Sequence, residues 1–184
     1  MRIADTFLVR RPVSEVWALF GDVPAITPCL PGAQLDRELD AGRYAGRMTV
    51  KLGPINAGFE GEATVTLDQA ALRGVIDGTG IDRRGGSRGR ISVAYTLTAA
   101  DDDTTVTIEA DVTLAGPAAQ FGRTGLLQEM SRRLIEQFVT CLEAKLAATS
   151  EADAAAVRAP ALDGASLLLG SLTSKVKKSL RSSR

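Results

Sequence analysis

A run of alternating apolar and polar residues between residues 33 and 115 constrains the fold more than any other feature of this chain. In the segment TVTIEADVTL, the apolar residues would face one way and the polar residues between them the other. Alternation with a period of two is typical of a strand that buries one face. RYAGRMTVKL, GFEGEATVTL and ISVAYTL repeat the pattern, and Gly-Pro, Asp-Gln, Gly-Gly and triple-Asp turn signals separate the runs. With a first strand over residues 3–9, the sequence predicts about seven antiparallel strands in a meander.

Helical signals occur at both ends of this run. Pro12 and Glu15 favour the first turn of a helix that Gly21 would end, and a second short helical segment follows up to Cys29. A long helical period covers about residues 118–148, with one apolar stripe made of Leu127, Met130, Leu134, Phe138, Cys141 and Lys145. The sequence therefore predicts the α+β class and a helix-grip arrangement, in which a seven-stranded curved antiparallel sheet wraps around a long C-terminal helix, with two short helices after the first strand.

Composition narrows the chemistry. The 184 residues include no histidine, which removes the commonest general base and zinc ligand. No CxxC or phosphate-binding glycine loop occurs, and Glu60, Glu62, Glu109 and Asp111 alternate with apolar residues, as expected on the outer face of strands. We therefore predict no catalytic residue, no metal site and no covalent cofactor.

The two cysteines, Cys29 and Cys141, both have apolar neighbours. Small buried hydrophobic residues without a disulfide would fit this pattern, and hence a reducing compartment. The N-terminus lacks the apolar core of a signal peptide, and no apolar run approaches the roughly 20 residues of a membrane span. We expect a cytoplasmic protein.

Glycines at 46, 61, 74, 78 and 80 lie inside predicted strands. They allow two interpretations, which are compatible: they let the sheet bend, or they leave room between the sheet and the long helix. An arginine cluster surrounds Gly85-Gly86, but the surrounding sequence is net acidic and has few aromatic residues, so we predict a solvated hairpin tip and no nucleic-acid partner.

Charge separates the C-terminus from the rest of the chain. The last twenty residues hold five basic side chains and no acidic one, so the first 164 residues carry a net charge of −5. We expect a domain over residues 1–148, a flexible linker over 149–165 and a basic amphipathic tail over 166–184. The tail residues predicted to contact a membrane surface are Leu168, Leu169, Leu172, Lys175, Val176, Lys177, Lys178, Leu180 and Arg181. A partner protein, or a merely solubilising role, would also fit this tail.

Four stretches carry a resemblance to a known family: VSEVWALFGDVPAITPCLPGA, LGPINAGFEGEATVTLD, GTGIDRRG and GPAAQFGRTGLLQEM. In this order they resemble the family of the carbon monoxide dehydrogenase G protein, within the START-like (SRPBCC) helix-grip superfamily, over about residues 1–148. The resemblance implies an apolar cavity under the C-terminal helix. It also implies an accessory role beside a molybdenum-containing hydroxylase of the carbon monoxide dehydrogenase type, membrane recruitment of that enzyme and the handling of a quinone.

Within such a fold, inward apolar residues would line the cavity, and the PCLPG corner would fix the second short helix at its mouth. The predicted lining is Trp17, Phe20, Ile26, Leu30, Tyr44, Met48, Val50, Phe59, Ile76, Val93, Tyr95, Phe121, Leu127, Met130, Leu134 and Phe138. For any one of these residues, plugging the end of a packed core is an alternative.

Three functions follow as hypotheses. The first is a non-enzymatic protein that holds a lipophilic ligand, such as menaquinone or ubiquinone, touches the inner face of the cell membrane and serves a molybdenum hydroxylase. The second is a START-like cyclase or aromatase, which would need a polar group inside the cavity, where Tyr44 and Tyr95 are the candidates. The third is a structural adaptor with a filled core.

Overall fold

The computed structural model describes residues 1–52, 55–123 and 126–160. Seven strands form one antiparallel sheet in the order β1-β7-β6-β5-β4-β3-β2. Their bounds are β1 Arg2–Val9, β2 Ala33–Asp40, β3 Arg43–Leu52, β4 Ile55–Asp68, β5 Arg73–Asp82, β6 Ser87–Ala100 and β7 Asp103–Ala115. The predicted meander is confirmed, and β1 extends it by pairing with β7, the last strand.

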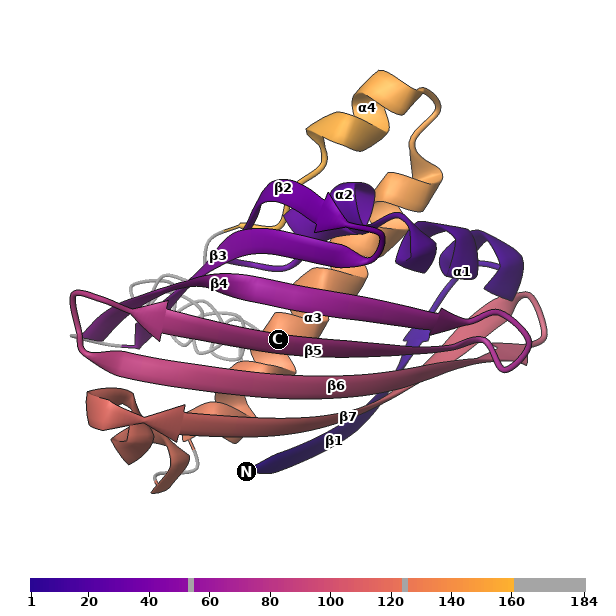
Figure 1. Cartoon of the computed structure of the whole chain (residues 1–184). Coiled ribbons are helices and arrows are strands. Elements are labelled where there is room, and N and C mark those ends of the chain that lie inside the picture. Colours follow the sequence, from indigo (N-terminus) through magenta and orange to yellow (C-terminus); the bar gives the residue numbers. More distant parts are fainter. Residues whose placement is uncertain (53–54, 124–125, 161–184) are drawn as a thin grey trace, which may run out of the picture.

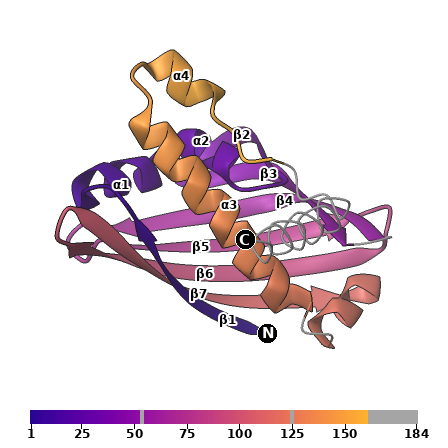
Figure 2. The ribbon, with the colours of Figure 1, turned by 180° about the vertical axis from the view of Figure 1, so that it is seen from behind.

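Helices lie on the concave side of the sheet and at its ends (Figure 1). Between β1 and β2 the chain forms α1 (Val13–Gly21), α2 (Val23–Ile26) and the short 3₁₀ turn η1 (Thr27–Cys29), and after β7 come η2 (Gly116–Arg123), α3 (Leu126–Ala147) and α4 (Glu151–Ala156). The view from behind shows α3 lying obliquely across the sheet (Figure 2). The α+β helix-grip architecture is therefore confirmed, although the single helix predicted for 118–148 is split into η2 and α3.

The strand register assigns one set of side chains to the concave face. Tyr95 pairs with Gly74 and Ile108, and Val93 pairs with Ile76 and Ala110. Directly paired residues point to the same side of a sheet, so these positions and their neighbours two residues away share the face beneath α3. Glu60, Glu62, Glu109 and Asp111 are exposed, as expected for the opposite, convex face.

A packed core occupies the end of the concave face next to α1. Its fully or almost fully buried members are Val9, Val16, Trp17, Phe20, Cys29, Tyr95, Leu97, Val106, Phe138, Cys141 and Leu142. Edge-to-face contacts join the ring of Phe20 to those of Tyr95 and Phe138, with centroids 5.0 Å and 6.0 Å apart. The indole N–H of Trp17 donates a hydrogen bond to Gln69 in the β4–β5 turn, which fixes α1 to the sheet.

The strand glycines make room for neighbouring groups of the protein. A Cβ at Gly46 or Gly61 would collide with the backbone of the adjacent strand, as expected where a sheet curves. At Gly74 the same Cβ would enter the ring of Tyr95, and at Gly80 it would lie 3.1 Å from Cβ of Phe59. Curvature and ring packing therefore account for these positions, and the room that the glycines leave is filled by neighbouring atoms.

The segment after α3 departs from the sequence prediction. The composition of residues 149–165 predicts a flexible linker, but the first part of this segment forms α4 and packs back onto the domain. Ser150 caps α4 by accepting a hydrogen bond from Asp153 N, and Lys145 Nζ donates to the carbonyl oxygen of Ala154 at 2.7 Å. Tertiary contacts thus order a short alanine-rich helix that would be marginal in isolation. The predicted tail, from residue 166, lies outside the described residues.

Candidate functional site

The concave face changes from packed to open along its strands. On β6, Leu97 and Tyr95 are 3% and 4% exposed, whereas Val93 is half-buried and Ile91, on the same face, is 39% exposed. On β7, Val106 is buried and Val112 and Leu114 are half-buried. The end next to α1 is therefore a filled core, and the opposite end keeps an accessible apolar surface.

The predicted lining residues fall into four groups. Trp17, Phe20, Tyr95 and Phe138 belong to the packed core. Half-buried side chains on the sheet or on α3 are those of Tyr44, Met48, Val50, Phe59, Ile76, Val93 and Leu134. Ile26 packs against the edge of the core, and Leu30 is 38% exposed in the corner after η1. The side chains of Phe121, Leu127 and Met130 lie outside the described residues.

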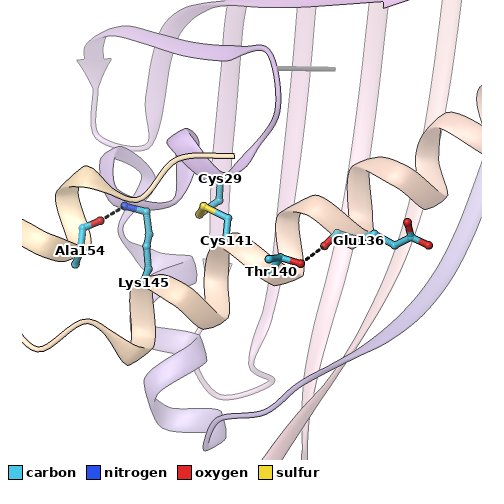
Figure 3. Close-up of a disulfide and its surroundings, with 6 residues drawn as sticks. All are labelled: Cys29, Glu136, Thr140, Cys141, Lys145 and Ala154. Carbon is cyan, nitrogen blue, oxygen red and sulfur yellow. Dashed lines mark hydrogen bonds between the residues drawn. A yellow bond between two sulfur atoms is a disulfide. The ribbon is translucent and has the colours of Figure 1, made fainter. Parts of the chain in front are cut away.

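The PCLPG corner connects four parts of the molecule. Cys29 forms a disulfide with Cys141 of α3 across 112 residues of sequence (Figure 3). Gly32 has φ +84° and packs against the carbonyl of Thr49 in β3, where an L side chain would collide. The backbone N–H of Ala159 donates to the carbonyl of Pro28 at 3.0 Å. The corner therefore holds α2 and η1 against α3, β3 and the segment after α4.

The disulfide shows that the expectation of two free cysteines is wrong. Both residues are buried among apolar side chains, as the sequence indicates, but they lie together, with Cα atoms 5.3 Å apart. Two isolated cysteines carry no spacing signal, so only the packing of η1 on α3 brings them together. The cysteine argument for a reducing compartment is lost with this correction.

The two tyrosines near the concave face have different environments. Burial raises the pKa of Tyr95 to about 12, so its hydroxyl stays protonated at neutral pH. Partial burial and the negative charge of Glu38 on the edge strand β2 raise the pKa of Tyr44. Either hydroxyl can donate a hydrogen bond, and neither is poised as a base near pH 7.

A polar recess lies on the rim of the domain. It has a volume of about 440 Å³ and is lined by Pro24, Thr27, Pro28, Ala33, Gln34, Leu35, Asp36, Arg47 and Arg158. Among these residues, Asp36 and Arg47 form an ion pair at 2.6 Å. This recess is chemically unlike the apolar compartment that the sequence predicts.

Two kinds of site are absent from the part of the chain that the structure describes. No group of three or more Cys, Asp or Glu side chains there could hold a metal ion. Among the same residues, no helix is both long and apolar enough to cross a membrane.

Together, the curved sheet, the helix across it and the partly accessible apolar face define a START-like helix-grip protein. Solved structures share this fold: a conserved protein from Geobacillus kaustophilus is 17% identical, with a TM-score of 0.70 over 80% of this chain and 95% of that one. A START superfamily protein from Mycobacterium smegmatis is 14% identical, with a TM-score of 0.52 over 77% of this chain and 97% of that one. The ZhuI aromatase/cyclase from a Streptomyces species is 16% identical, with a TM-score of 0.55 over 79% and 93%.

The family follows from the sequence itself. The model of the carbon monoxide dehydrogenase CoxG family matches residues 6–147, which is well over half of the chain. The chain belongs to this family. No match is found among curated proteins.

Proposed function

We propose that this protein is a non-enzymatic accessory protein of a molybdenum-containing hydroxylase of the carbon monoxide dehydrogenase type. It holds a lipophilic ligand, most simply a quinone such as menaquinone or ubiquinone, on the concave face beneath α3. Its C-terminal tail contacts the inner face of the cell membrane and links the enzyme to the quinone pool. The enzyme performs the redox chemistry, and this protein supplies an apolar container.

The observation that carries the proposal is the incomplete cover of the concave face. Ile91 shares its face with buried Tyr95 and Leu97 and is nevertheless 39% exposed, and Val93 between them is half-buried. Leaving an apolar side chain accessible gives up about 25 cal/mol for each Å² that burial would remove from water. A long apolar ligand on this face would recover that free energy, and the unbranched side chain of half-buried Met48 can adapt to its shape.

Mass spectrometry of an organic extract tests the proposal. The protein is purified without detergent from a quinone-containing host, then extracted before and after incubation with quinone-loaded membranes. We expect about one quinone or related isoprenoid per chain. An empty extract under both conditions would leave the membrane-recruiting adaptor as the better description.

A cyclase or aromatase is the enzymatic alternative, favoured only by the fold shared with the ZhuI aromatase/cyclase. Such an enzyme needs a polar group that acts as an acid or base at the concave face. The raised pKa of Tyr95 suits a hydrogen-bond donor and does not suit a base at neutral pH. Recovery of a cyclised or dehydrated product from a polyketide-like substrate would favour this alternative.

A further inference from the structure

Among the described residues, one buried side-chain oxygen stands out because it has no hydrogen-bond partner. Oε1 of Gln137, on α3, is enclosed and accepts no hydrogen bond. The buried polar and charged residues Asp82, Ser87, Thr104 and Lys145 are all satisfied. Lys145, for example, donates to the carbonyl of Ala154, and Thr104 donates to that of Arg11. The amide oxygen of Gln137 is therefore an exception in the described part of the chain.

An unsatisfied buried acceptor is unfavourable. Removing a carbonyl oxygen from water without a replacement donor lowers stability several-fold or more, and folded proteins rarely retain such atoms without a reason. A donor from outside the chain would remove this cost. The atom therefore points to a bound group that the folded protein is built to receive.

The position of Gln137 places this acceptor on the flank of α3 next to the PCLPG corner. Gln137 lies one helical turn before Cys141, and residues four apart on a helix share a face. The disulfide fixes Cys141 against Cys29, so this flank of α3 faces η1 (Figure 3). Leu134, half-buried, lies three residues before Gln137 on the same flank. The acceptor thus lies between two apolar positions of the helix, at the side where the corner meets α3.

We propose that Gln137 anchors the polar head of the bound ligand and that its Oε1 accepts a hydrogen bond from a ligand hydroxyl. This inference rests on the proposed function. The ligand class is an apolar chain or ring system that carries an aromatic hydroxyl, which includes a hydroquinone, the reduced form of a quinone. A quinone carbonyl can only accept, so it would need the amide to rotate and offer Nε2–H. The amide orientation favours the reduced form.

A pair of probes that differ in one hydroxyl tests the anchor directly. 4-Heptylphenol and heptylbenzene are titrated in competition with a fluorescent apolar dye, against the full-length protein and its Gln137→Met variant. Methionine keeps the length of the side chain and removes the amide. We expect the variant to bind heptylphenol about five- to tenfold more weakly, because one hydrogen bond is lost, and to bind heptylbenzene as well as the unmodified protein does.

A matched control variant and a melting experiment separate the hydrogen bond from helix packing. Thr140→Val changes an exposed position on the same helix, where the hydroxyl already donates to the carbonyl of Glu136, and should leave the binding of both probes unchanged. Without ligand, Gln137→Met should raise the melting temperature, since an unsatisfied polar atom is removed. A variant that melts lower and loses both probes together would show a packing role and overturn the anchor.

The outcomes separate the two proposals. Equal binding of heptylphenol to the variant and the unmodified protein would overturn the role of Gln137 and leave the ligand-binding function standing. Failure of the unmodified protein to bind either probe or to release quinone on extraction would overturn the ligand-binding function, and the anchor with it.

Discussion

Tyr95 shows how a single residue acquires its properties from its neighbours. Its ring occupies the space that a side chain at Gly74 would need, and it packs edge-to-face against Phe20. Period-two alternation places Tyr95 on the inner face, so the sequence predicts its direction. The sequence does not predict that the ring belongs to the packed core, because that depends on how far α1 and α3 cover the sheet.

The buried phenol predicts a loss of stability in alkali. The pKa of Tyr95 is about 12 in the folded protein and about 10 in an unfolded chain. Between these values the folded state keeps a proton that the unfolded state has released, so the free energy of unfolding falls as pH rises from 10 towards 12. This contribution is fully present below pH 10. Tyr95→Phe should remove it, which is a change of about 2–3 kcal/mol.

Urea denaturation at pH 8, 10 and 11 measures this effect. The difference between the unmodified protein and Tyr95→Phe isolates the phenol from other groups that titrate in alkali. Tyr44→Phe is the control, since Tyr44 is half-buried and should account for a smaller part of the slope. An equally steep decline in Tyr95→Phe would show that this phenol is not responsible.

At the scale of elements, the corner between η1 and β2 is the feature that sequence reasoning locates without finding its main contact. Two prolines and Gly32 predict a rigid turn, and Gly32 does pack tightly on β3. The sequence does not reveal the disulfide to α3, because 112 residues separate the two cysteines. The helical stripe predicts that only the stem of Lys145 is covered, whereas the whole residue is buried beneath the chain that folds back through α4.

The disulfide predicts a large effect of reduction on stability. A cross-link between distant residues restricts the unfolded chain, and its loss typically lowers the free energy of unfolding by about 2–4 kcal/mol. We expect this shift in the denaturation midpoint when a dithiol reductant is added, and a similar shift in the Cys29→Ser/Cys141→Ser double variant. The reductant should then have no further effect on that variant. Titration of two free thiols in the unreduced, denatured protein would contradict the cross-link itself.

At the scale of the whole molecule, the proposed function depends on joining an apolar container to a membrane. The tail carries five basic residues and a leucine-rich stripe, and each basic residue contributes on the order of 1 kcal/mol near an anionic surface. Deletion of residues 163–184 should abolish co-sedimentation with anionic liposomes and leave ligand content unchanged. Replacing Lys175, Lys177 and Lys178 with Gln should weaken binding in the same direction, more at low salt. Binding of the truncated protein at the full level would move the membrane contact to the domain.

The sequence by itself determined the strands, their inward faces, the long helix and the family, because these depend on periodicity and on motifs that are local in the chain. Only the tertiary structure decided that Cys29 meets Cys141, that α4 folds back over Lys145, and that Gln137 carries an acceptor without a donor. Each of these depends on which distant segments touch. Packing of α3 on the sheet and the corner sets those contacts, and no pattern within one segment encodes them.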